Sequence, residues 1–135
     1  NSKMAEQIAQ AARGFERHTT GHAPKSVTVV LSDETLVVTL HGALSPAERA
    51  LSKDAGGAAQ VQEFHRQLFN DSVETLRGEI KRITGVAVRE ATVEVDTTTG
   101  TVVKAFTTGT VVQVFLLAGS VPLDTWSGNG SDGSS

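Results

Sequence analysis

The chain has 135 residues, a formal net charge of −3 and no cysteine. Its hydrophobic share of 39% and charged share of 20% are typical of a soluble globular protein with a single core. The absence of cysteine excludes disulfides, thiolate metal sites and cysteine nucleophiles. Because lysine and arginine form no run, non-specific binding of nucleic acid is not expected either.

No segment of the sequence predicts insertion into a membrane. The first ten residues lack the basic start and apolar run of a signal peptide. The longest apolar stretch, near 111–118, is too short to span a bilayer. We therefore expect a soluble protein with one folded domain over 1–118. A flexible tail is expected over 119–135, because periodicity is lost after Gly119 and 127–135 contain only Gly, Ser, Asn and Asp.

The N-terminal part predicts a helix followed by a β-hairpin. Over 2–18, apolar residues fall on one helical face: Met4, Ile8, Ala11, Ala12 and Phe15. Gly21 suits a left-handed helix cap, and Pro24 cannot continue the helix. The Val-, Leu- and Thr-rich segments 26–31 and 36–40 flank a short polar turn, which is typical of a hairpin.

The middle of the chain predicts a long, broken helix. Ser45 can cap free backbone N–H groups, Pro46 has no N–H group to leave unpaired, and Glu48 can complete a capping box. A break is expected over 54–57, since two adjacent glycines cost roughly 2 kcal/mol in a helix interior. The helix should resume over 58–84. Its buried face is predicted to hold Val61, Phe64, Leu68, Leu76, Ile80 and Ile83.

The C-terminal part predicts three strands, over 86–95, 101–106 and 110–117, with a bulge near Glu90 and Ala91. The element order is therefore α-ββ-α-βββ. We predict a two-layer α+β fold, in which an antiparallel sheet of about five strands from two hairpin units is covered by the long helix and the N-terminal helix.

The sequence offers no clear catalytic or ligand-binding constellation. The four histidines show no metal-ligand spacing, and no nucleophile elbow, dinucleotide fingerprint or phosphate loop occurs. No metal and no cofactor are therefore predicted. His65 is interpreted as a partly buried polar residue beside the core. Glu48 is interpreted as a capping residue rather than a general base, and Glu63 with Arg66 as a surface pair.

Several motifs carry a resemblance to a known family. They are Gly21-x-x-Pro24 before a strand, the run from Leu36 to Glu48 containing Gly42 and Ser45-Pro46, Thr84-Gly85-Val86-x-Val88, Asp96 with Thr99-Gly100, and Val114 to Leu116. In these motifs the chain resembles the DUF2294 family, described as the MpsC-like component of a sodium-translocating, membrane-potential-generating system. Two positions depart from the family pattern. Its usual Gly-Arg-Gly-Pro is Gly21-His22-Ala23-Pro24 here, and a basic position of the long helix falls at His65, beside Arg66.

The resemblance implies a small bacterial accessory protein, linked in some members to membrane modules for ion or inorganic-carbon uptake, without catalytic residues to carry over. We therefore predict a non-enzymatic cytoplasmic protein that binds a protein partner, such as a membrane transport module. The candidate surface joins the Gly21–Pro24 loop to the segment His41–Arg49. Its candidate binding residues are Gly21, Pro24, His41, Ser45, Glu48, Arg49 and Arg66.

Self-association and two other functions stay open. Edge strands rich in Val and Thr, with few charges, favour a homodimer or larger oligomer formed through the sheet. A small-ligand or anion sensor would use the helix start at Pro46, where free N–H groups attract negative charge. An enzyme using His and Glu is the third possibility.

Overall fold

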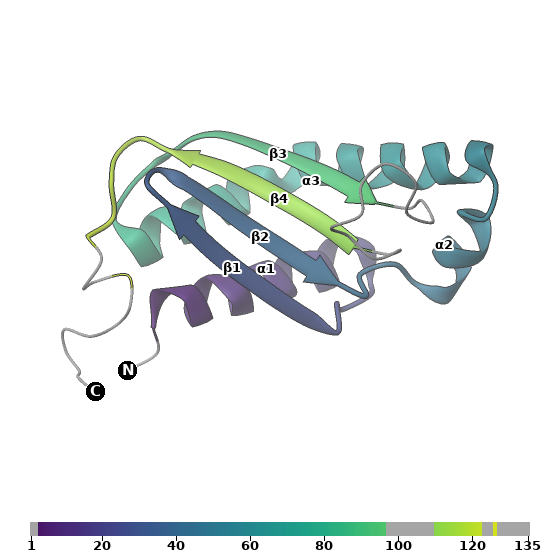
Figure 1. Ribbon diagram of the computed structural model, residues 1–135, viewed down its shortest axis with the longest axis horizontal. Helices are drawn as coiled ribbons and strands as arrows, with labels where there is room; N and C mark the ends of the chain where they lie inside the picture. The colour runs from purple at the N-terminus through teal and green to yellow at the C-terminus, as the bar shows by residue number, and fades with distance from the viewer. Residues whose placement is uncertain (1–2, 97–109, 123–125, 127–135) are drawn as a thin grey trace.

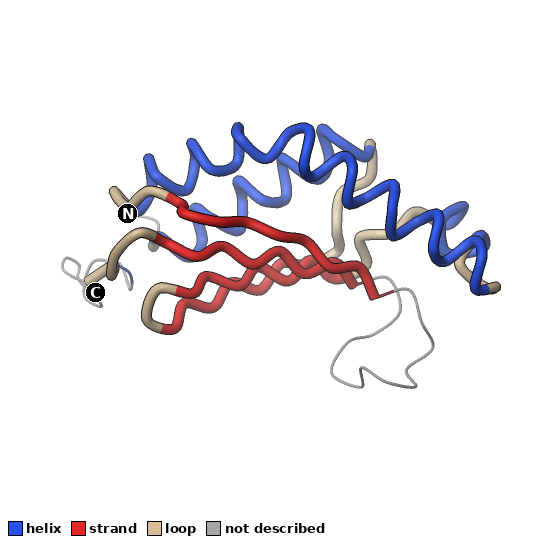
Figure 2. The backbone as a smooth tube through the Cα atoms, turned by 90° about the horizontal axis from the view of Figure 1, so that it is seen from above, coloured by secondary structure: helices blue, strands red, loops and turns tan. Residues whose placement is uncertain are grey.

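A computed structural model describes residues 3–96, 110–122 and 126. The described elements are α1 (Met4–Thr20), β1 (Ser26–Ser32), β2 (Thr35–His41), α2 (Pro46–Leu51), α3 (Ala55–Thr84), β3 (Val88–Asp96) and β4 (Thr110–Leu117). The strands form one antiparallel sheet in the order β1-β2-β4-β3. Both long helices lie on the same face of this sheet (Figure 1 and Figure 2).

The predicted α+β class, with an antiparallel sheet covered by the N-terminal helix and the long helix, is confirmed. Within the described residues the sheet has four strands rather than about five, and the strand predicted over 101–106 lies outside them. The predicted bulge is present as a register shift between Val88 and Glu90. In the tail predicted over 119–135, Val121 is buried and Trp126 packs against the core, whereas 127–135 lie outside the described residues.

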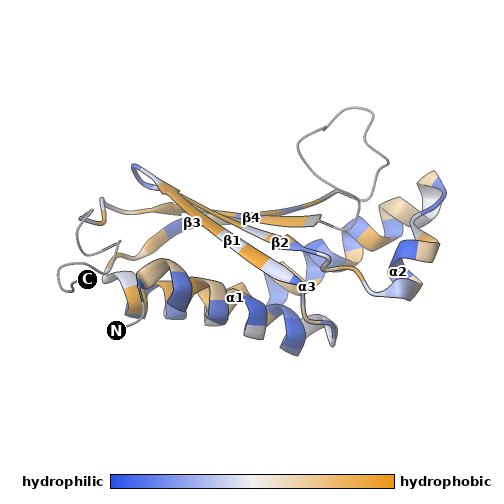
Figure 3. Ribbon diagram, turned by 60° about the horizontal axis from the view of Figure 1, so that its bottom comes forward, coloured by the Kyte–Doolittle hydropathy of each residue, from blue (hydrophilic) through white to orange (hydrophobic). Residues whose placement is uncertain are grey.

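The core lies between the sheet and the two long helices, where Figure 3 shows apolar strands facing the helix layer. Alternate residues of the two central strands point into it and are buried: Leu36, Val38, Leu40, Val111, Phe115 and Leu117. Phe69 of α3 stands edge-on to Phe15 of α1, with ring centroids 6.2 Å apart, and is 6.1 Å from Phe115 of β4. These ring contacts pack both helices against the sheet.

The buried face of α3 differs in part from the prediction. Val61, Leu76, Ile80 and Ile83 are buried as expected, but Phe64 is 47% exposed and Leu68 is only half-buried. His65 and Phe69 occupy the core face instead, four and eight residues after Val61. This spacing is equally helical. The prediction relied on hydrophobicity, so it assigned Phe64 to the core face in place of the polar His65.

The helix break also lies elsewhere than predicted. The chain leaves α2 at Ser52, and α3 already begins at Ala55, so that Gly56 and Gly57 form its first turn. Asp54 caps this turn, and its Oδ1 accepts a hydrogen bond of 2.7 Å from the Gly57 N–H group. Gly57 is buried against the end of α2, where a Cβ atom would overlap the Leu51 carbonyl oxygen. The glycine therefore permits the close approach of the two helices.

The close approach at Gly57 predicts a difference between two neighbouring substitutions. Gly57→Ala should lower the free energy of unfolding by about 1–3 kcal/mol, since the added methyl group forces the backbone of α2 away. Gly56→Ala is the matched control, because its Cβ would make only an ordinary contact with Asp54 at 3.5 Å. Urea unfolding followed by circular dichroism measures both. Equal losses in the two variants would contradict the close approach.

Candidate functional site

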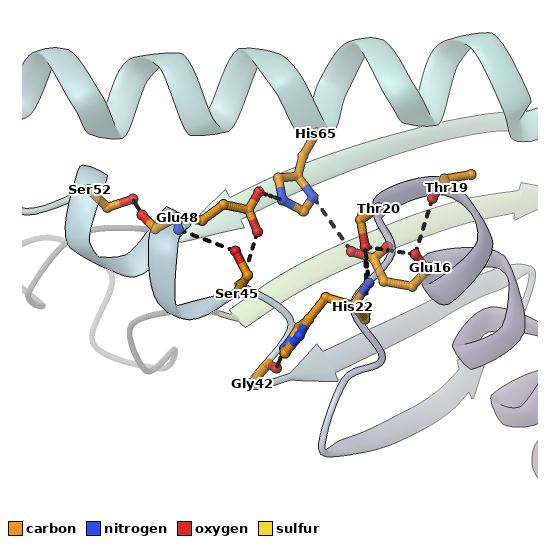
Figure 4. A network of polar contacts seen from close by, with 9 residues as sticks. All are labelled: Glu16, Thr19, Thr20, His22, Gly42, Ser45, Glu48, Ser52 and His65. Atoms are coloured by element: carbon orange, nitrogen blue, oxygen red, sulfur yellow. Dashed lines mark hydrogen bonds and ion pairs between the residues drawn. The ribbon is translucent and has the colours of Figure 1, made fainter.

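His65 of α3 lies between two carboxylates, one from α1 and one from α2 (Figure 4). Its Nε2 atom is 2.9 Å from Glu48 Oε2, and its Nδ1 atom is 3.5 Å from Glu16 Oε2. Glu16 and His65 are each only 3% exposed. We name these three residues the Glu16–His65–Glu48 cluster. It is a buried, charged centre at which α1, α2 and α3 meet.

Local sequence places Glu48 in the cluster. Ser45 Oγ accepts a hydrogen bond of 3.2 Å from the Glu48 N–H group, and the Ser45 N–H group donates to Glu48 Oε1 at 2.9 Å. The predicted capping box is therefore confirmed. Because Oε1 is held by the cap, Oε2 remains directed at His65. The same carboxylate thus starts α2 and joins it to α3.

Helical periodicity and a glycine cap place Glu16. It follows Ile8 and Ala12 at four-residue intervals on the buried face of α1. The helix ends at Gly21, whose φ of 80° gives the left-handed cap predicted from the sequence. Hydroxyl groups of Thr19 and Thr20 bond carbonyl groups of the last turn. The buried face of α1 therefore carries the Glu16 side chain into the core.

The pKa values of Glu16 and Glu48 are shifted in opposite directions. Burial raises the pKa of Glu16 to about 7, while the charge of His65 acts against this rise and that of Glu48 adds to it. Burial also acts to raise the pKa of Glu48, but the hydrogen bonds from His65 and Ser45 outweigh it and hold that pKa below its ordinary value. The cluster therefore keeps Glu48 ionised, whereas Glu16 can exchange a proton near neutral pH.

A groove opens beside the cluster, between α2 and the first turns of α3. It has a volume of about 400 Å³ and is lined by Thr20, Ser45, Glu48, Leu51, Gln60, Val61 and Phe64. Leu51 and Phe64 are each 47% exposed, which is high for large apolar side chains. The ring of Phe64 stands edge-on to that of His65, with centroids 5.8 Å apart. The groove therefore combines an apolar rim with the partly exposed carboxylate of Glu48.

The structure brings together the two segments of the predicted interaction surface. His22 Nε2, in the loop from Gly21 to Pro24, is 3.2 Å from the Gly42 carbonyl oxygen. The Lys25 N–H group donates to the His41 carbonyl oxygen at 2.8 Å. The two segments are therefore in contact at the end of the sheet nearest α2.

The individual candidate residues divide into two groups. Ser45 and Glu48 line the groove. The groove is not lined by Gly21 or Arg49, which are exposed, or by Pro24, which is buried. The His41 ring also lies outside the groove, 3.2 Å from Thr28 Oγ1 on the sheet. Arg66 is on the exposed face of α3, where it forms the predicted pair with Glu63 at 2.9 Å. Arg66 also does not line the groove.

Sequence reasoning missed Glu16 and the role of His65. The signal available was position: both residues interrupt an otherwise apolar face at a four-residue interval, after Ala12 in α1 and after Val61 in α3. A charged residue on such a face needs a buried partner of opposite charge or a hydrogen-bond partner. Reading the two faces together would have suggested the pair, although no spacing motif does so.

The arrangement is suited to holding a proton rather than to nucleophilic catalysis. Both ring nitrogens of His65 face carboxylates, so neither faces a serine or threonine hydroxyl group as a base must. Among the described residues, no group of three or more acidic, His or Cys side chains could hold a metal ion. Within the same residues, no helix is long and apolar enough to cross a membrane.

Comparison with known proteins agrees with the motifs. The family model described as "Na+-translocating membrane potential-generating system (MpsC)" matches residues 1–110. The chain belongs to the MpsC family. It is also similar to "Uncharacterized protein YbcI" of Bacillus subtilis (strain 168), with 25% identity over 103 residues, which cover 76% of this chain and 83% of that protein. No solved structure matches. The family resemblance predicted from the sequence is therefore confirmed.

The raised pKa of Glu16 predicts a pH-dependent stability for this MpsC-family protein. The folded chain retains a proton that the unfolded chain releases above about pH 4.5, so the associated stabilisation is complete below that pH and is lost as the pH rises to about 7. Glu16→Gln should remove this loss. Between about pH 5 and pH 8, the unfolding free energy of the wild type should fall relative to the variant by on the order of 2 kcal/mol.

Urea denaturation across this pH range measures the effect, and the difference between the two proteins cancels titration common to both. Glu74→Gln is the control, because the side chain of Glu74 is 86% exposed. Parallel curves for the wild type and Glu16→Gln would contradict the assignment. Glu48 has the opposite pH dependence. Because its pKa is lowered in the folded chain, ionised Glu48 stabilises the fold at pH values above about 4.5. This stabilisation is lost as the pH falls below that value.

Removal of the imidazole should destabilise the protein because it leaves Glu16 buried without its partner. His65→Leu is expected to cost about 3 kcal/mol at neutral pH. The double variant Glu16→Met/His65→Leu replaces both buried groups by apolar ones and should recover much of this loss. Thermal and urea unfolding of the four proteins of this cycle give the interaction energy. Additive losses would show that the two side chains are not coupled.

Proposed function

We propose that this chain is a non-enzymatic, cytoplasmic component of a sodium-translocating, membrane-potential-generating system, which acts by binding a protein partner of that system. Membership of the MpsC family supports the link to such a system. The groove beside Glu48 carries the proposal of a binding role. Its rim holds Phe64 and Leu51, each 47% exposed, and large apolar side chains exposed around a concave site are typical of protein interaction surfaces.

The chemistry of the groove indicates what kind of partner residue it would take. Its apolar rim favours an aliphatic or aromatic side chain, and Glu48 offers a negative charge with its side chain 17% exposed. A partner segment with an apolar residue beside a basic one would satisfy both features. The partner in this proposal is a membrane protein of the same system, which the chain meets from the cytoplasmic side.

The other functions have less support from the described residues. An anion at the start of α2 would approach Glu48, whose carboxylate already accepts the Ser45 N–H group there, so that like charges would repel. An enzyme that used His65 would need a free ring nitrogen, and both nitrogens face carboxylates. The groove volume of about 400 Å³ is also within the range of small-molecule sites, so a small apolar ligand is the second candidate.

Site-specific photo-crosslinking in native cells tests the proposed function. A photoreactive residue at Phe64 should capture a membrane protein of the system, recovered in the membrane fraction, and Leu51→Ser should reduce its yield at least about tenfold. The same probe at Glu74 is the control, because the side chain of Glu74 is 86% exposed and does not line the groove. Equal capture from both positions, or none from Phe64, would contradict binding through the groove.

Self-association through the sheet is the second part of the proposal. Strand β1 is at an edge of the sheet, carries no charged residue and exposes Val30. An uncharged edge can pair with the same edge of a second copy. Val30→Lys should therefore convert a homodimer into a monomer in light scattering, whereas Phe64→Ser should leave the dimer intact. A monomeric wild type, or a dimer lost only with Phe64→Ser, would contradict pairing through β1.

A further inference from the structure

A second, much smaller cavity lies on the core side of the Glu16–His65–Glu48 cluster. It has a volume of about 10 Å³ and reaches from α1 and α3 to the sheet. Glu16, His65 and Gln113 contribute its charged and amide side chains, beside apolar residues of the core. Gln113 is on central strand β4, opposite Val38 of β2 and Val93 of β3, and is 1% exposed. A polar side chain therefore stands where the sheet is otherwise apolar.

Two oxygen atoms at this cavity lack a hydrogen-bond donor among the described residues. They are Glu16 Oε2 and Gln113 Oε1, and both are fully buried. An unsatisfied buried acceptor costs about 1–3 kcal/mol, so native proteins rarely leave two at one place. His65 Nδ1 is 3.5 Å from Glu16 Oε2, which is long for a hydrogen bond.

The neighbouring hydroxyl groups do not serve these oxygens. Thr19 Oγ1 donates to the Phe15 carbonyl oxygen at 2.9 Å, and Thr20 Oγ1 donates to the Glu16 carbonyl oxygen at 2.7 Å. Each hydroxyl group has one hydrogen, and in both residues it is already used. When Glu16 is ionised, the two side-chain acceptors therefore require an occupant of the cavity that donates two hydrogens.

We propose that this cavity is a binding site for a single water molecule, which donates one hydrogen to Glu16 Oε2 and the other to Gln113 Oε1. The volume is that of about one water-sized sphere, and a polar cavity of this size suffices for one buried water. Water has two hydrogens, which match the two free acceptors. The inference does not depend on the proposed function, because it concerns the core and not the groove.

A metal ion fits the cavity poorly. Calcium and magnesium take about six or more oxygen ligands, whereas the free oxygens identified here are two. In the described part of the chain, no group of three or more acidic, histidine or cysteine side chains is placed to hold a metal ion. A neutral donor is therefore the better occupant.

The water completes a polar chain through the protein. Glu48 of α2 contacts His65 of α3, His65 contacts Glu16 of α1, and the water joins Glu16 to Gln113 of β4. Helices α1, α2 and α3 are thereby connected to the centre of the sheet by polar contacts. This connection gives a physical reason for a glutamine in the interior of β4.

A crystal structure of the whole chain at about 1.5 Å resolution or better tests the site directly. We expect one density peak at hydrogen-bond distance from both Glu16 Oε2 and Gln113 Oε1. A direct bond from the Gln113 amide nitrogen to the Glu16 carboxylate would overturn the proposal. So would an empty cavity, or a peak surrounded by five or six oxygens at the shorter distances of a cation.

Magnetic relaxation dispersion of water, which detects long-lived internal water molecules, tests the site in solution. Gln113→Leu removes one acceptor and is expected to lower the number of long-lived waters by one. Thr92→Val is the matched control, because Thr92 is an exposed residue of β3 and should leave the number unchanged. An unchanged number in Gln113→Leu would overturn the proposal. The wild-type crystal structure decides the question if the variant does not fold.

Discussion

The contact of His65 with two carboxylates is the interaction on which the arrangement of the helices depends. Helix α2 has six residues, none of them buried, so it has no apolar face with which to fix its own position. It is held by Glu48, which bonds the buried imidazole at 2.9 Å, and by the close approach of Leu51 to Gly57. The groove between α2 and α3 exists because these contacts keep α2 in place.

The cluster is better understood as a source of specificity than of stability. Burying an imidazole and two carboxylates costs desolvation energy that their attraction only partly repays, and apolar side chains of similar volume often stabilise a fold as well. What the charges add is a defined geometry, since each carboxylate must meet its own ring nitrogen. In this protein the same geometry shapes the rim of the groove, and it keeps Glu16 able to exchange a proton near neutral pH.

The sequence predictions for the site are correct where the interacting residues are close together in the sequence. The capping box of Ser45 and Glu48 and the ion pair of Glu63 and Arg66 span three residues, and both are confirmed. The glycine cap at Gly21 is likewise local and correct. Phe64 was assigned wrongly to the core face, because hydrophobicity alone could not show that the helix presents His65 there.

The sequence by itself determined the α+β class, the first helix, the hairpin and the caps at Gly21 and Ser45, because these depend on neighbouring residues and on periodicity. Tertiary structure alone decided that Glu16 meets His65, that Gln113 of β4 reaches the same cavity, and that Leu51 and Phe64 form the rim of one groove. These residues come from separate elements. Their meeting depends on how α1 and α3 lie across the sheet, which no local pattern encodes.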